Sequence, residues 1–168
     1  MRFSAAFAVS AFNRRARYCL VPRHMTTTIT TNSESETAAV GRELAATLSA
    51  GDVVLLHGDL GAGKTAFVKG LAEGLGVPGD EVSSPTFTIM QEYRGGRLPL
   101  FHVDLYRLDD PRELDDLGLE EIAEAGVLAI EWAEKLSQAT HGAVRVSIEH
   151  AGETARRLTL TGPGAARK

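Results

Sequence analysis

A glycine-rich segment over residues 58–65 constrains the fold more than any other part of the sequence. It reads Gly-Asp-Leu-Gly-Ala-Gly-Lys-Thr and fits G-x-x-x-x-G-K-[ST] at every defined position. The preceding run of Val and Leu over residues 53–57 predicts a buried parallel strand. Apolar residues recur at helical spacing over residues 67–75, with Gly74 and Gly76 as stop signals. Strand, loop and helix therefore follow in the order of a phosphate-binding P-loop.

The residue types in this segment explain how it would bind an anion. Glycines allow the backbone to curl so that successive N–H groups point at phosphate oxygens. The N-terminus of the following helix adds partial positive charge. In this motif the lysine reaches the terminal phosphates of a nucleoside triphosphate, and the hydroxyl binds Mg²⁺. The predicted nucleotide-binding residues are Gly58, Asp59, Leu60, Gly61, Ala62, Gly63, Lys64 and Thr65.

Charge is distributed unevenly along the 168 residues. Residues 1–24 contain five arginines and no acid, which is typical of an organelle transit peptide or of a misassigned start ahead of Met25. The acidic remainder is a poor electrostatic match for nucleic acid. We expect residues 1–32 to be a disordered leader or a misassigned start. Residues 33–161 should form a P-loop ATPase domain, and residues 162–168 a frayed tail.

Cysteine content and hydropathy exclude two classes of protein. The single cysteine, Cys19, supplies neither a disulfide framework nor a cysteine zinc site. No apolar run approaches the roughly 20 residues that a membrane span needs. We therefore expect a cytoplasmic protein with no membrane association.

The remaining pattern predicts a three-layer, P-loop NTPase-like α/β sandwich around a mixed parallel and antiparallel sheet. Residues 26–35 are expected to be a polar lead-in, and Ser33 or Ser35 to cap the first helix. Helices are expected over about residues 36–49, from Pro111 to about Ala125, and over 133–138. The expected strands after the P-loop are an antiparallel hairpin (86–93 and 98–103), a buried strand (127–130) and a second hairpin (143–149 and 156–161).

Two carboxylates at the ends of predicted strands are candidate metal ligands and catalytic groups. Mg²⁺ in a P-loop site needs oxygen ligands or bound waters opposite Thr65. Asp104 and Glu131 each end an apolar strand, where ligands bind in open α/β sheets. Each acid has a simpler interpretation, as a helix cap or a solvated residue just past a strand. Spacing does not decide which of the two would bind the metal directly.

A cluster of hydroxyl residues follows the P-loop helix. Ser83, Ser84 and Thr86 flank Pro85. One interpretation is a switch segment that senses the γ-phosphate of a nucleotide. The other is ordinary turn chemistry around the proline.

Two further residues lie beside the strand-end acids. Trp132 follows Glu131, and core packing is its default role, with a lid over the nucleotide or a partner contact as the alternative. His102 precedes Asp104, and we favour a structural hydrogen bond over a general-base role for it.

Four motifs in this order resemble the TsaE (YjeE-type) family of small bacterial ATPases. They are the P-loop, Ser-Pro-Thr-Phe at 84–87, His-Val-Asp-Leu-Tyr-Arg-Leu at 102–108 and Ile-Glu-Trp at 130–132. The resemblance covers about residues 33–160. It implies an ATPase required for threonylcarbamoyladenosine formation at position 37 of tRNAs that read ANN codons. Such a protein binds the TsaD and TsaB proteins, supports turnover of that synthase by ATP hydrolysis, and meets tRNA only indirectly through the complex.

The resemblance also implies roles for individual residues. Lys64 and Thr65 would hold phosphates and Mg²⁺, Glu131 would be the Walker-B-type metal residue, and Asp104 the second catalytic acid. Thr86 would be the switch hydroxyl.

On the adenosine side, the resemblance implies contacts from Glu34 and Thr37, with Gly152 as a further candidate. The sequence departs from the family at Ala66, where a second hydroxyl commonly follows the P-loop threonine. A side-chain contact to the α-phosphate is therefore missing, which affects the expected affinity and leaves the binding mode unchanged.

Two other functions fit a P-loop domain of this size. A small kinase would phosphorylate a nucleotide or metabolite, but it must close arginines over the transferring phosphoryl group. Arg94, Arg97, Arg107 and Arg112 are available for this, without an obvious arginine-rich lid. A non-enzymatic assembly factor, with negligible hydrolysis of its own, is the third hypothesis.

Overall fold

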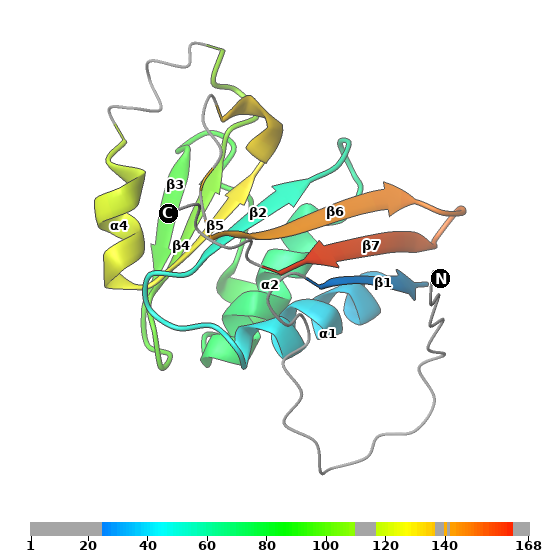
Figure 1. Cartoon of the computed structure of the whole chain (residues 1–168), viewed down its shortest axis with the longest axis horizontal. Coiled ribbons are helices and arrows are strands. Elements are labelled where there is room, and N and C mark those ends of the chain that lie inside the picture. Colours follow the sequence, from blue (N-terminus) through cyan, green and yellow to red (C-terminus); the bar gives the residue numbers. More distant parts are fainter. Residues whose placement is uncertain (1–24, 110–116, 137–139, 141, 163–168) are drawn as a thin grey trace.

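A seven-stranded mixed sheet forms the centre of the protein (Figure 1). The computed structural model describes residues 25–109, 117–136, 140 and 142–162. The strand order is β1-β7-β6-β2-β5-β4-β3. Strands β4, β5, β2 and β6 run parallel, while β3 and the pair β7–β1 add antiparallel edges. The strands are β1 (Thr26–Thr31), β2 (Val53–His57), β3 (Met90–Tyr93), β4 (Leu100–Asp104), β5 (Val127–Glu131), β6 (Val144–His150) and β7 (Arg156–Thr161).

Helices cover both faces of the sheet. Helices α1 (Glu34–Ala45) and α2 (Lys64–Leu75) pack together on one face, and α4 (Leu119–Ala125) lies on the other (Figure 1). Successive side chains of β2 point to opposite faces of the sheet. Val54 and Leu56 pack in the core under α1 and α2, whereas Leu55 packs in the core on the other face. Two short 3₁₀ turns, η1 (Gly79–Glu81) and η2 (Ala133–Lys135), complete the described elements. The predicted three-layer sandwich around a mixed sheet is confirmed.

The start of α1 and its contact with α2 fix the position of the P-loop helix. Ser33 caps α1 by accepting a hydrogen bond from the Glu36 amide at 3.1 Å, and the Glu36 carboxylate accepts one from the Asn32 amide at 2.8 Å. A Cβ on Gly70 would overlap the backbone of Ala38. The two helices are therefore in direct backbone contact, which holds α2 and the loop before it in place.

The N-terminal boundary predicted for the domain is wrong. Residues 26–31, expected to be a polar lead-in, form the edge strand β1, which pairs antiparallel with β7 from Thr26–Thr161 to Thr31–Arg156. Threonine is β-branched and suits a strand of which only one face meets the core, so its polarity concealed the strand. The helix expected over 36–49 ends earlier, at Ala45. The leader over 1–24, the helix start at Pro111 and the tail over 163–168 lie outside the described residues.

No helix among the described residues has both the length and the apolar character that crossing a bilayer requires.

Candidate nucleotide-binding site

The candidate site lies at the edge of the sheet where the parallel strands end. Strand β2 leads into the P-loop, while β4 and β5 end side by side at Asp104 and Glu131, which are register partners. A cavity of about 380 Å³ opens here, and its lining includes Lys64, Thr65 and both acids. A second cavity of about 300 Å³ shares part of this lining, including Glu34 and the P-loop residues Gly61 and Gly63. The two cavities are therefore contiguous.

The backbone of the P-loop needs glycine at its turning points. Gly63 caps α2 with φ +110°, a conformation that residues with a Cβ rarely adopt. Gly58 has φ +144°, and a Cβ there would also overlap the carbonyl of Ile148 on β6. The glycine spacing that identified the motif is thus required by the local geometry of this chain.

Lys64 is nearly buried at the centre of the loop, with 4% of its surface exposed. Its ammonium group donates to the carbonyls of Gly58 at 2.5 Å and Asp59 at 2.9 Å, and lies 3.9 Å from the ring centre of Trp132. Burial lowers the pKa of Lys64, and neighbouring carboxylates, first among them Glu131, offset this only in part. An anion that entered the loop would therefore meet a cation with little solvation.

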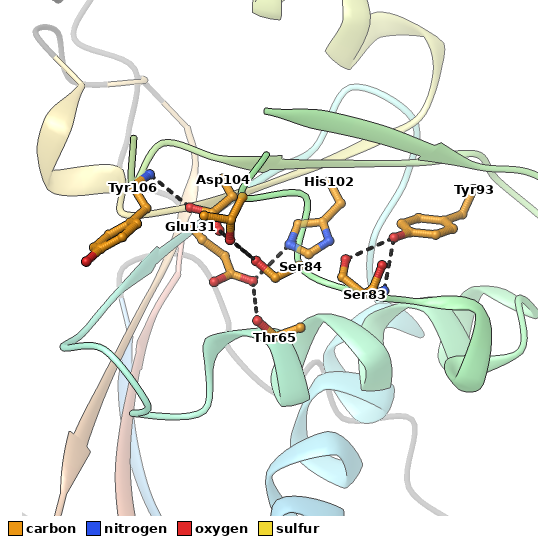
Figure 2. Close-up of polar contacts among 9 residues, drawn as sticks. Thr65, Ser83, Ser84, Tyr93, His102, Asp104, Tyr106 and Glu131 are labelled. Carbon is orange, nitrogen blue, oxygen red and sulfur yellow. Dashed lines mark hydrogen bonds and ion pairs between the residues drawn. The ribbon is translucent and has the colours of Figure 1, made fainter. Parts of the chain in front are cut away.

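Glu131 connects the P-loop to the sheet. Its Oε1 accepts a hydrogen bond from the Thr65 hydroxyl at 2.9 Å and is hydrogen-bonded to Nε2 of the His102 ring at 2.9 Å (Figure 2). Glu131 is 3% exposed and His102 is fully buried. The hydrogen bond expected for His102 is therefore present, and its partner is the candidate metal ligand.

Asp104 is bonded to the segment that follows α2. Its Oδ2 accepts hydrogen bonds from the hydroxyls of Ser84 and Thr86, both at 2.7 Å, and its Oδ1 accepts one from the Tyr106 amide at 2.9 Å. Burial raises the pKa of this carboxyl, but the hydrogen bonds from Ser84, Thr86 and Tyr106, with a smaller contribution from His102, lower it overall. Asp104 is thus an ionised acid held by three donors.

The predicted residues are distributed over three places. The first cavity brings together Lys64, Thr65, Thr86, Asp104 and Glu131, and the exposed Leu60 and Gly61 are at its rim. Glu34 lines both cavities and Thr37 the second. Gly58 and Asp59 line a separate cavity beside β6, and Ala62 is fully buried.

Gly152 lines neither of the two contiguous cavities, whereas its neighbours Glu153 and Thr154 line the second.

Several residues at the site were not singled out from the sequence. Asn32, Glu153, Thr154 and Arg156 line the second cavity, and the Arg156 guanidinium donates to the Ala62 carbonyl at 3.1 Å. No local pattern identifies them, because the fold brings them together from separate places: Asn32 lies between β1 and α1, Glu153 and Thr154 lie in the β6–β7 turn, and Arg156 begins β7.

Trp132 is half-buried with φ +59°, and its ring covers Lys64 and lies 5.0 Å from the ring of Tyr106. Trp132 therefore contacts Lys64 at the cavity, in addition to the core packing that was expected of it.

The donor set fits a magnesium site completed by a ligand. Within the described ranges, no three His, Cys, Asp or Glu side chains cluster so as to hold a metal by themselves. The oxygens that line the first cavity include the Thr65 hydroxyl and the carboxylates of Glu131 and Asp104. Mg²⁺ commonly takes one or two carboxylates and fills its remaining positions with water and substrate phosphates.

A strand, a glycine-rich loop cradling a buried lysine, and two acids at the ends of adjacent parallel strands define a P-loop nucleotide-binding protein. The family model "Threonylcarbamoyl adenosine biosynthesis protein TsaE" matches residues 31–158. The chain belongs to the TsaE family.

Individual relatives agree with this assignment. A tRNA threonylcarbamoyladenosine biosynthesis protein TsaE from Bacillus subtilis is 47% identical over 137 residues, which cover 80% of this chain and 84% of the relative. The protein of the same name from Streptomyces coelicolor is 46% identical, covering 74% and 89%. The crystal structure of Bacillus subtilis YdiB superposes with a TM-score of 0.67 at 39% identity, covering 83% of this chain and 87% of that one.

Proposed function

We propose that the protein is a Mg²⁺-dependent ATPase that acts in tRNA threonylcarbamoyladenosine biosynthesis. Its ATP hydrolysis would support turnover of a synthase containing the TsaD and TsaB proteins, which modifies position 37 of tRNAs that read ANN codons. The contact that carries the proposal is the 2.9 Å hydrogen bond between Thr65 and Glu131. This contact supports the proposal because it brings the P-loop hydroxyl close to the strand-end carboxylate, as two ligands of one Mg²⁺ would need to be.

The two contiguous cavities give the proposed nucleotide its orientation. The triphosphate would lie in the P-loop beside Lys64, and the adenosine would lie toward Glu34 and Thr37 in the second cavity. Ala66 lines both cavities without offering a hydroxyl. The backbone N–H groups at the start of α2 would therefore supply the contacts to the α-phosphate.

We assign different tasks to the side chains of the first cavity. Lys64 neutralises charge on the β- and γ-phosphates, and Thr65 and Glu131 hold the metal, which would screen the developing negative charge. Asp104 and Thr86, which also line the first cavity, would lie on the γ-phosphate side. Asp104 would orient the attacking water, and Thr86 would report the state of the γ-phosphate through its bond to Asp104.

The arginines favour an ATPase over a kinase. The guanidinium of Arg97 donates to the carbonyls of Ala45 and Leu48, Arg94 pairs with Glu92, and Arg107 lies over the ring of Phe87. Arg112 lies outside the described residues. These three arginines have partners outside the phosphate-binding loop, and Arg156, which does contact that loop, donates to the backbone carbonyl of Ala62. Phosphoryl transfer to a second substrate calls for arginines over the phosphates.

A pull-down with TsaD and TsaB, followed by a tRNA-modification assay with and without ATP, tests the proposal. We expect the chain to bind the TsaD–TsaB complex and to stimulate modification only when ATP is present. The matched control is Lys64→Ala, which removes the phosphate contact and should abolish the stimulation. Absence of both binding and stimulation by the wild-type chain would favour the kinase. Such a protein would work in the cytoplasm without a membrane partner.

A further inference from the structure

His102 is a fully buried polar residue in the sheet, next to the candidate site. It has no direct role in the proposed chemistry. It lies on β4, two residues before Asp104, and its Nε2 lies 2.9 Å from Oε1 of Glu131. We propose that His102 is a positioning residue that fixes the Glu131 carboxylate so that its other oxygen faces the metal. This inference rests on the proposed function and adds the group that orients the metal ligand.

The partners of the two Glu131 oxygens differ. Oε1 receives hydrogens from both Thr65 and His102, which occupies the two lone pairs of a carboxylate oxygen. No described residue hydrogen-bonds to Oε2 (Figure 2). Glu131 lines the first cavity. The carboxylate is therefore held by one oxygen while the other is available to a ligand in the cavity.

The two donors to Oε1 are not equivalent. The Thr65 hydroxyl is the group that binds Mg²⁺ in a P-loop, through an oxygen lone pair, so its position depends on the metal even though its hydrogen can stay on Glu131. His102 is buried in the sheet layer and has no such second role. It is the donor that can hold Oε1 both with and without the metal, which is how outer-shell partners orient metal ligands.

Burial of the ring also indicates which nitrogen carries hydrogen. Nε2 lies at hydrogen-bond distance from a carboxylate oxygen, so we assign the hydrogen of this contact to Nε2. Nδ1 is buried without a hydrogen-bond partner among the described residues. A ring with hydrogen on Nε2 alone leaves one acceptor without a partner and avoids a buried, unpaired N–H donor.

Magnesium titrations of nucleotide binding by the full chain test the proposal without relying on turnover. The affinity for a fluorescent ATP analogue is measured first in EDTA and then at increasing concentrations of Mg²⁺. In His102→Leu the half-saturating Mg²⁺ concentration should rise about tenfold, as for lost outer-shell partners. Affinity in EDTA should be unchanged, because His102 does not line the phosphate cavity. An unchanged Mg²⁺ requirement in His102→Leu would overturn the proposal.

Two variants separate positioning from packing. In His102→Gln, the side-chain amide can donate from nearly the place of Nε2, so the Mg²⁺ requirement should return to within about threefold of wild type. Val103→Ala opens a buried site on the opposite face of the same strand, and should lower thermal stability without changing the Mg²⁺ requirement. Equal impairment of His102→Gln and His102→Leu, or a tenfold shift in Val103→Ala, would contradict the proposal.

Nitrogen NMR of the histidine rings in the wild-type chain gives a readout that requires no variant. We expect the His102 hydrogen on Nε2 and its signal to persist when Mg²⁺ and the nucleotide are added. A ring without hydrogen on Nε2 would overturn the proposal even if His102→Leu failed to fold. If wild-type nucleotide affinity did not respond to Mg²⁺, the proposed function itself would fail, an outcome distinct from a failure of His102 alone.

Discussion

Asp104 and Glu131 are register partners at the ends of adjacent parallel strands, yet they bind different parts of the molecule. Both carboxylates are almost fully buried. Glu131 is hydrogen-bonded to the P-loop through Thr65 and to the sheet through His102. Asp104 is hydrogen-bonded to Ser84, Thr86 and the Tyr106 amide, which all belong to loops. The same residue chemistry at the same edge of one sheet thus serves two separate networks.

This difference shows that the sheet edge and the loops determine different properties of the two acids. Parallel strands bring their ends to one place, which fixes where the two acids lie. The segments that arrive from elsewhere decide what each acid contacts. We infer that Glu131 acts on the metal, whereas Asp104 couples the segment over residues 83–87 to the γ-phosphate side.

The largest effect is expected from Glu131→Ala. Loss of the carboxylate would remove the proposed metal ligand and should lower Mg²⁺-dependent phosphate release by roughly 10²–10³-fold, the scale for losing one group that stabilises developing charge. The fold should persist because Glu131 ends its strand at a cavity. Phosphate release and a thermal melt followed by circular dichroism check both parts. Wild-type hydrolysis in this variant would refute the assignment of Glu131.

Asp104→Ala should have a smaller effect on hydrolysis and a larger one on loop order. We expect hydrolysis to fall about 10–100-fold, the scale for partners outside the direct ligand set. Amide hydrogen exchange should accelerate over residues 83–89, because Ser84 and Thr86 lose their shared acceptor. Glu131→Ala is the matched control and should leave exchange there unchanged. Equal acceleration in both variants would remove the distinction between the two networks.

The double substitution Ser84→Ala and Thr86→Ala should change how stability depends on pH. A carboxyl with a lowered pKa stabilises the fold above its unfolded pKa of about 4, and this contribution is lost as the pH falls through the lowered value. Removing two donors raises the pKa of Asp104, so the variant should be about 2 kcal/mol less stable near neutrality.

Urea unfolding measured from neutral to acidic pH checks this expectation. The stabilities of the variant and the wild type should converge in acid, where the carboxyl is protonated in both. A difference that stays constant with pH would mean that the hydroxyls do not act through Asp104.

The smallest effect is expected at the far edge of the sheet. Deleting residues 1–24 should leave the melting temperature unchanged. Both carboxylates lie several strands away from β1, so neither of their hydrogen-bond networks should be affected. Deleting residues 1–31 is the comparison, because it removes β1 and exposes the edge of β7. A drop of several degrees with the shorter deletion would show that residues 1–24 pack on the domain.

Local patterns were sufficient for the P-loop and for the two strand-end acids. The motif specifies strand, loop and helix in order, and each apolar strand ends in its acid within a few residues, so these parts needed no long-range information. The edge strand β1 was missed because a threonine-rich segment beside a half-covered sheet lacks a clear apolar pattern.

The networks around the acids could not be predicted from spacing. The contact of His102 with Glu131 depends on the register between β4 and β5, and the contact of Thr65 depends on where α2 begins relative to β5. The lining of the second cavity includes residues of the β6–β7 turn, which only the fold brings there. Gly152, the candidate named from the sequence, belongs to this turn but does not line the cavity.

The central claim is that Glu131, and not Asp104, holds the metal. It is tested most directly by the Mg²⁺ concentration that half-saturates binding of a fluorescent ATP analogue in Glu131→Gln and in Asp104→Asn. Both changes remove one charge and keep the shape of the side chain. The account predicts a rise of at least about tenfold for Glu131→Gln and less than about threefold for Asp104→Asn. Equal rises, or the larger rise in Asp104→Asn, would contradict it.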